Sequence, residues 1–218
     1  MRKKLSVIIN TPDVPTGFTE LEYLESSGTQ WIKTDYIFTN QDDVSCVAKL
    51  IKVGSFWANL FGCLDEYGAS LYFGWMNYGN AAQGKAAYGS FKNFQWDEDP
   101  ALKKMNIQLS PDGNLYINNI LIYTNTSNKN SFPAKYPASL FAINNKGDAS
   151  WGQCSQRIFS FNIKRAETSV FTLVPVLDAD GTPCMYDKIS RTCFYNKGKG
   201  TFGYKIKATG ETVAPKST

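Results

Sequence analysis

The sequence predicts an all-β protein in which two antiparallel sheets pack as a sandwich. Three observations lead to this prediction. Short runs of alternating apolar and polar residues follow one another along most of the chain, and clusters of Gly, Pro, Asn and Asp separate them. No window shows a long apolar repeat with the helical period. Strands at short, regular spacing without intervening helices are typical of a sandwich or a barrel.

The alternating runs define the strands that we expect, in chain order. They lie at Leu21–Leu24, Gln30–Lys33, Val44–Lys52, Phe56–Cys63, Ser70–Trp75, Lys85–Phe91, Lys104–Leu109, Asn114–Ile117, Ile120–Tyr123, Ser139–Ala142, Arg157–Ile163, Thr172–Leu177, Met185–Asp187 and Cys193–Tyr195.

The sequence predicts two turns in the middle of the chain in detail. In Ser110–Gly113, Pro111 presets φ for a turn and Gly113 accepts a positive φ, so the strands on either side are expected to pair. Asn118-Asn119 is expected to form the next tight turn, because asparagine tolerates the left-handed conformations of a two-residue hairpin loop. This region is therefore predicted to be a meander.

Length and composition favour one folded domain. The chain has 218 residues, of which 43% are hydrophobic and 14% aromatic, enough to build a core and unlike a disordered chain. The net charge is +4, with both signs mixed along the sequence and no basic stripe. We therefore expect a soluble surface and no nucleic-acid partner.

The chain contains no histidine. This excludes Ser-His-Asp and Cys-His catalysis, HExxH zinc sites and any imidazole acid or base. It removes several common enzyme classes at once.

The five cysteines are an odd number, and none has the C-x-x-C spacing of a zinc site. We expect free, mostly buried thiols and folding in a reducing compartment. As an alternative, Cys184 and Cys193 could face each other across a hairpin.

The two ends of the chain differ from the middle. Residues 1–17 are predicted to be an arm whose apolar part, Leu5–Ile9, is too short for the core of a signal peptide. Residues 205–218 are predicted to be a polar tail, and residues 18–204 the folded domain. Since Val7, Ile8 and Ile9 form a β-prone triplet that can extend a neighbour's sheet, we expect the arm to anchor the domain to another protein chain.

Residues 153–204 carry a resemblance to a known family. IFSFNIK, FTLVPVLD and CMYDKISRTCFYN are the strand and hairpin runs of this stretch, with a turn at Asp178–Gly181. Together with LEYLESSGTQWIKTDY at residues 21–36, they resemble the LamG-like domains of the concanavalin A-like lectin/glucanase superfamily, of the kind found in phage virion proteins and gut bacterial surface proteins. The resemblance implies a jelly-roll sandwich over most of the chain, and a fold of this kind hosts many functions.

The glucanases of that superfamily use two carboxylates, on a strand that usually reads E-x-D-x-x-E, and this chain has no such pattern. The acidic pairs at Asp65-Glu66 and Asp97–Asp99 lie in turn-like contexts, and adjacent strand residues point to opposite faces. Asp97–Asp99 offers hard oxygen ligands, but its spacing matches no calcium motif. We therefore expect no catalysis, no metal and no cofactor.

A saccharide site needs an aromatic platform beside hydrogen-bonding side chains. The segment Phe73–Trp96 interleaves rings with Asn and Gln, and it is the best candidate by composition. Its predicted ligand-contacting residues, with core packing as the alternative for any single ring, are Trp75, Asn77, Tyr78, Tyr88 and Trp96.

The function implied by the resemblance is a non-enzymatic phage virion component, such as a fibre, an appendage or a surface decoration, with a lectin-like domain facing outward. Such a protein is made in the host cytoplasm and released by lysis, which fits the missing export signal. Its expected partners are other virion proteins or further copies of the chain, and a host-surface glycan, with no membrane insertion. The alternative is a bacterial surface carbohydrate-binding module, and a glycoside hydrolase is disfavoured.

Overall fold

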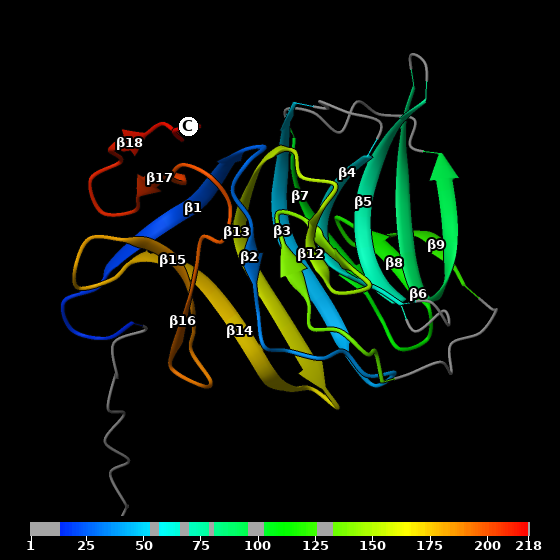
Figure 1. Cartoon of the computed structure of the whole chain (residues 1–218). Coiled ribbons are helices and arrows are strands. Elements are labelled where there is room, and N and C mark those ends of the chain that lie inside the picture. Colours follow the sequence, from blue (N-terminus) through cyan, green and yellow to red (C-terminus); the bar gives the residue numbers. More distant parts are fainter. Residues whose placement is uncertain are drawn as a thin grey trace, which may run out of the picture.

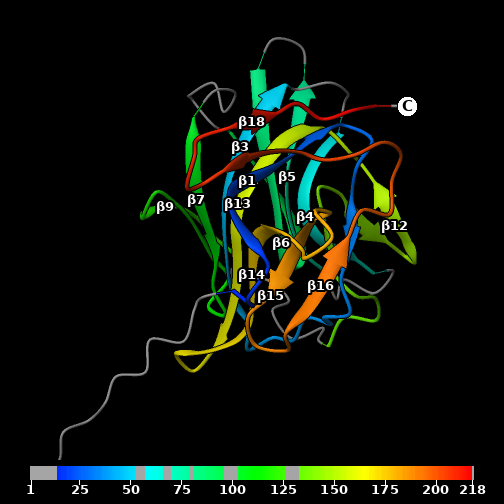
Figure 2. The ribbon, with the colours of Figure 1, turned by 90° about the vertical axis from the view of Figure 1, so that its left-hand side faces the viewer.

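A computed structural model of the chain describes residues 14–52, 57–65, 70–78, 81–95, 103–125 and 133–217. For Trp57, 76–78, 81–83, 90–95 and 149–151 it describes the backbone alone. The described residues form strands and turns and contain no helix, so they hold no apolar helix that could cross a membrane. Two sheets face each other as two layers (Figures 1 and 2), which confirms the predicted antiparallel sandwich.

The larger sheet has eleven strands, in the order β16-β15-β14-β1-β13-β3-β7-β8-β9, with β17 paired to β1 and β18 paired to β17. Its strands are β1 (Thr19–Ser27), β3 (Asp43–Lys52), β7 (Lys104–Leu109), β8 (Asn114–Ile117), β9 (Ile120–Thr124), β13 (Ser155–Arg165), β14 (Thr168–Leu177), β15 (Pro183–Asp187), β16 (Thr192–Tyr195), β17 (Gly203–Ile206) and β18 (Thr212–Val213).

The smaller sheet has seven strands, with β12-β11-β4-β10-β2 as one path and β5 and β6 continuing from β4. They are β2 (Ile32–Lys33), β4 (Trp57–Leu64), β5 (Ser70–Tyr78), β6 (Ala81–Gln95), β10 (Ser139–Leu140), β11 (Ile143–Asn145) and β12 (Asp148–Trp151). Its pairs are antiparallel apart from a short parallel pairing of β11 with β4.

The core lies between the two layers, and strand alternation builds it. Every second residue of β3 is buried, from Val44 to Leu50, because successive strand side chains point to opposite faces. Aromatic rings join the layers at the centre, where the Phe61 and Phe161 rings meet edge-on with centroids 5.2 Å apart. Each such buried ring contributes about 2–3 kcal/mol to folding.

The predicted turns form as expected. The Gly113 amide donates to the Ser110 carbonyl at 2.9 Å, and Gly113 has a φ of 78°. Asn118 and Asn119 have φ angles of 51° and 66°, the pair of left-handed residues that a type I′ hairpin loop requires.

The sheet continues beyond residue 204, where the sequence predicted a polar tail to begin. β17 pairs with β1, β18 pairs with β17, and Thr201 and Lys216 exchange two backbone hydrogen bonds of 2.9 and 3.0 Å. The carbonyl of Lys216 also accepts from the buried Gln30 side chain at 2.9 Å. Residues 205–217 are thus part of the domain, because backbone pairing with β1 holds a segment that buries few side chains of its own.

The folded domain also begins before residue 18, where the sequence predicted its start. Val14 and Phe18 pack against Val176, Cys184 and Tyr186, so the folded part begins by residue 14. Val7, Ile8 and Ile9 of the predicted arm lie outside the described residues.

The five thiols are free, and four of them are buried, as apolar-like side chains would be. Burial raises the pKa of Cys63 to about 12, so this thiol is not reactive near neutral pH. Cys184 lies opposite Tyr195 and Cys193 opposite Tyr186, so the two cysteines are diagonal neighbours on their hairpin and form no disulfide.

Candidate functional site

Two of the predicted sugar-binding rings lie in the core. Trp75 and Tyr88 are only 1% and 2% exposed. The Trp75 ring meets Phe73 edge-on at 4.8 Å, and the Tyr88 hydroxyl donates to the Asp42 carbonyl at 2.8 Å. The prediction that these rings form an exposed platform is therefore wrong.

The register of β5 explains this result. Leu71, Phe73 and Trp75 share the face of β5 that is turned to the other layer, and turning the indole outward would forfeit about 3 kcal/mol of burial. Asn77 and Tyr78 belong to β5, but their side chains lie outside the described set. Trp96 also lies outside the described residues.

On the outer face of the larger sheet there is a place where two neighbouring strands, β13 and β14, separate. β13 pairs with β14 from Phe161 onward, but the earlier residues of β13 pair with β1 instead. The first two residues of β1 pair with the end of β14, so β1 is wedged between the two strands (Figure 1). Leu21, Glu22 and Tyr23 of β1 consequently have no partner in either β13 or β14, and we call this place the strand fork.

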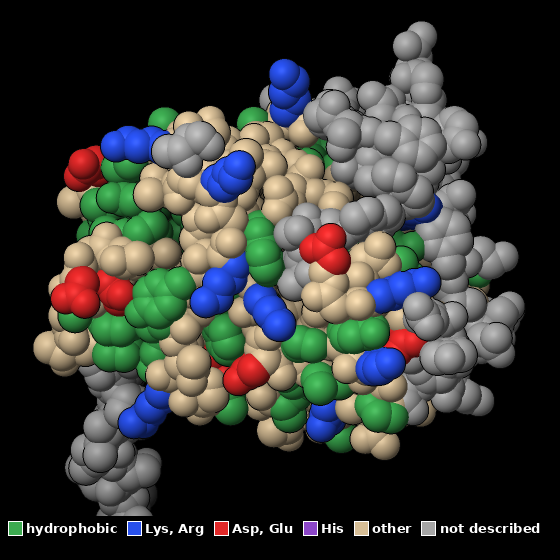
Figure 3. Space-filling view, in the orientation of Figure 1, with side chains coloured by type: hydrophobic (Ala, Val, Ile, Leu, Met, Phe, Trp, Pro, Cys, Tyr) green, Lys and Arg blue, Asp and Glu red, His purple; other side chains and the backbone are tan. Residues whose placement is uncertain are grey.

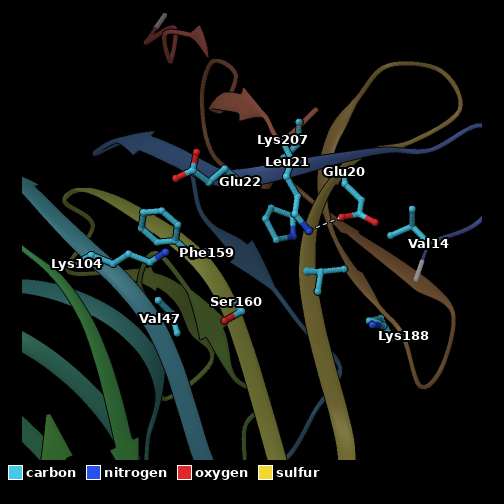
Figure 4. Close-up of a pocket in the computed structure, with 12 residues that line it drawn as sticks. Val14, Glu20, Leu21, Glu22, Val47, Lys104, Phe159, Ser160, Lys188 and Lys207 are labelled. Atoms are coloured by element: carbon cyan, nitrogen blue, oxygen red, sulfur yellow. Dashed lines mark hydrogen bonds and ion pairs between the residues drawn. The ribbon is translucent and has the colours of Figure 1, made fainter. Parts of the chain in front are cut away.

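The strand fork holds a pocket of about 340 Å³. This volume lies at the low end of the range of ligand sites, about 300–1,000 Å³. Charged side chains from β1, β7 and two turns line it together with apolar ones (Figure 4). The lining residues are Val14, Glu20, Leu21, Glu22, Val47, Lys104, Phe159, Ser160, Val174, Pro175, Lys188 and Lys207.

Phe159 is the aromatic ring of this pocket. A bulge between Ile158 and Ser160 shifts the register of β13 against β3, and such bulges re-aim side chains. The ring therefore lies on the outer face, edge-on to Tyr23 with centroids 5.5 Å apart. The Lys104 ammonium lies 4.0 Å from the ring centroid, a cation–π contact.

Two ion pairs form the upper rim of the pocket. The Lys207 ammonium donates to Glu20 Oε2 at 2.8 Å, as Figure 4 shows. The Lys205 ammonium lies 2.7 Å from Glu22 Oε2. The hydrogen bond from Lys205 holds the pKa of Glu22 below its usual value, with smaller effects of nearby charges. Glu22 is therefore a carboxylate at neutral pH, able to accept hydrogen bonds but not to donate a proton.

A second polar cluster lies at one end of the sandwich and is saturated by its own bonds. The fully buried Asp42 carboxylate accepts from Arg165 Nε at 2.6 Å, from the Tyr36 hydroxyl at 3.0 Å and from the Thr39 amide at 2.8 Å. These bonds hold the loop before β3 in place. Because its carboxylate is engaged by these bonds, we assign this cluster a structural role.

On the face drawn in Figure 3, the described residues form no large patch of one charge. Lysines and arginines are scattered among acidic, apolar and other groups on the face drawn in Figure 3. Within the described residues no three His, Cys, Asp or Glu side chains gather as a metal site would require.

Sequence reasoning missed the strand fork because its residues come from five strands and several turns. One signal was present in β13. Ile158, Phe159 and Phe161 are apolar on both phases of the strand, and such a break in the alternation indicates a bulge or an outward-facing side chain. Comparison of the sequence with models of known protein families and with curated proteins finds no match.

Proposed function

We propose that this chain is a non-enzymatic, lectin-like binding domain that takes a saccharide in the pocket at the strand fork. The observation that carries the proposal is the outer-face ring of Phe159 in a pocket rimmed by paired carboxylates and amines. An aromatic ring contacts the C–H face of a sugar, while carboxylates and amines bond its hydroxyls. The resemblance to concanavalin A-like lectins supports the same function, and with it we propose that the strands are connected as in a jelly roll.

The chemistry of the pocket supports binding over hydrolysis. A glycosidase needs one carboxylic acid with a raised pKa to protonate the leaving oxygen. Both pocket carboxylates instead face lysine ammoniums, and the pKa of Glu22 is lowered. Glu20 and Glu22 are thus suited to hold hydroxyl groups.

The setting that we propose is a phage virion, in which the domain faces outward and other virion proteins or further copies of the chain hold it. This part rests on the family resemblance and on the basic, β-prone residues 1–13. A bacterial surface module is the alternative. Mass spectrometry of purified particles separates the two, since a virion component is present in them at a fixed ratio and a cellular module is absent.

Phe159→Ala tests the binding site. Losing one stacking ring should weaken saccharide binding about tenfold, the equivalent of about 1.4 kcal/mol. A glycan array identifies ligands for the unaltered protein, and calorimetry compares the variant on the strongest of them.

Tyr195→Ala is the matched control, because Tyr195 is 38% exposed and lies outside this pocket. It should bind like the unaltered protein. Equal affinity of Phe159→Ala and the unaltered protein for every glycan would contradict the proposal.

A further inference from the structure

The stretch of β1 that lines the strand fork is held by the C-terminal strand β17. Leu21 pairs with Ile206, and the next pair joins Tyr23 to Lys205. Among the described residues, only those of β17 pair with β1 at these two positions. The register shifts between the two pairs, so Glu22 is the extra residue of a bulge, and bulges re-aim side chains. β17 thus supports β1 where β1 is paired with neither β13 nor β14.

The same segment supplies both cations that pair with the carboxylates of the pocket. The Lys205 ammonium of β17 lies 2.7 Å from Glu22 Oε2. Lys207, directly after β17, contacts Glu20 twice. Its ammonium donates to Glu20 Oε2 at 2.8 Å, and its backbone amide donates to the Glu20 carbonyl at 3.1 Å. Each of these carboxylates is therefore tied to the C-terminal segment of the chain.

The far end of this segment is fixed in turn. β18 pairs with β17, and the carbonyl of Lys216 accepts from the buried Gln30 side chain at 2.9 Å. A Cβ at Gly200 would overlap the carbonyl oxygen of Lys216, so the close approach of the two requires glycine. We call residues 203–216 the C-terminal strap. Because both of its ends are held, the strap presents its lysines to β1 in a fixed place.

The lysines of the strap decide what the carboxylates can do. A carboxylate has about four acceptor positions, so one bond from an ammonium fixes its orientation and leaves positions for sugar hydroxyls. The hydrogen bond from Lys205 is the main cause that lowers the pKa of Glu22, and burial opposes it. The charges of Lys205, Lys104 and Arg157 lower this pKa further. Glu22 therefore stays ionised, as an acceptor must, to a lower pH than an unpaired glutamate.

We propose that the C-terminal strap is part of the saccharide site, with Lys205 and Lys207 as positioning residues for the two carboxylates of the pocket. This inference rests on the proposed saccharide-binding function. A sugar hydroxyl then donates to a carboxylate that is already oriented, so binding loses less freedom of that side chain. As the pH falls, protonation of Glu22 removes an acceptor, and the pair with Lys205 moves this loss to a lower pH.

Calorimetry of the full chain with neutral galacto-, gluco- and manno-oligosaccharides tests the inference. Lys205→Met should weaken binding about two- to fivefold, the range for one exposed charged contact. Its affinity should also begin to fall at a higher pH than that of the unaltered protein, because Glu22 loses the bond that keeps it ionised. Lys205→Arg should restore both the affinity and the pH profile, and Lys207→Met should weaken binding by a similar factor.

A titration of the Glu22 carboxyl carbon in ¹³C-labelled protein follows the same pair without a saccharide. Glu22 should take up its proton at a lower pH in the unaltered protein than in Lys205→Met. Lys199→Met is the matched control, since Lys199 is an exposed lysine just before the strap and lies outside the pocket. This control should change neither the titration nor the affinity.

Equal affinities and pH profiles of Lys205→Met and the unaltered protein, with binding weakened in Phe159→Ala, would overturn the inference and leave the saccharide site standing. An affinity loss that Lys205→Arg does not restore, or an unchanged titration of Glu22 in Lys205→Met, would also overturn the positioning role. Binding of none of the three series by the unaltered protein would count against both the inference and the proposed function.

Discussion

Single residues in this protein act through the partners that burial gives them. Asp42 and Glu22 are both carboxylates paired with a cation, yet the Asp42 side chain is fully buried and the Glu22 side chain is 39% exposed. A solvated pair contributes little to folding, about 0–1 kcal/mol, whereas removing one member of a buried network leaves its other members without their bonds. Asp42 therefore stabilises the fold, whereas Glu22 can bind a ligand.

Asp42→Ala should destabilise the fold by about 2–4 kcal/mol, because Tyr36 and Thr39 lose an acceptor and Arg165 loses its counter-charge. Arg165 is 38% exposed on its side chain and recovers part of the loss through water, which sets the lower end of the range. Urea unfolding followed by circular dichroism measures the change. Asp35→Ala, at an exposed position of the same loop, should shift the unfolding free energy by less than about 0.5 kcal/mol; equal effects of the two changes would refute the structural role.

Strands and turns were the elements that the sequence predicted best. Alternation over β3, β7 and β13 defined both the strand and its buried face, because a period of two leaves little freedom once one face is apolar. The short strands β2, β10 and β18 depend on backbone pairing with distant segments, so their bounds carry little local signal. The polar segment at β17 and β18 was predicted to be a tail for this reason.

The hairpin that joins β8 and β9 provides a test at the scale of one element. Asn119→Val should cost about 1–2 kcal/mol, because a β-branched side chain clashes in the left-handed conformation that Asn119 adopts at a φ of 66°. Asn119→Gly should change the unfolding free energy by less than about 0.5 kcal/mol, since glycine accepts that conformation. Thermal or urea unfolding compares them, and a neutral valine variant would mean that this turn does not have the conformation described.

At the scale of the whole molecule, the composition of a segment was a poor guide to the site. Phe73–Trp96 has many rings and amides, but the two rings of the predicted set that are described, Trp75 and Tyr88, serve the core. The pocket instead lies where β1, β13 and β14 divide, and a bulge turns its partly buried ring to the outer face. Such a place depends on which distant strands pair and in which register, and no local pattern of the sequence contains that information.

Chemical-shift mapping on the ¹⁵N-labelled protein, titrated with the saccharide that binds best, tests the strand-fork site most directly. The account predicts that the largest amide shifts cluster at Leu21, Glu22, Phe159, Ser160 and Val174, with smaller changes over β5 and β16. Largest shifts within residues 73–96, and none at the strand fork, would contradict the account and return the site to the segment that composition first suggested.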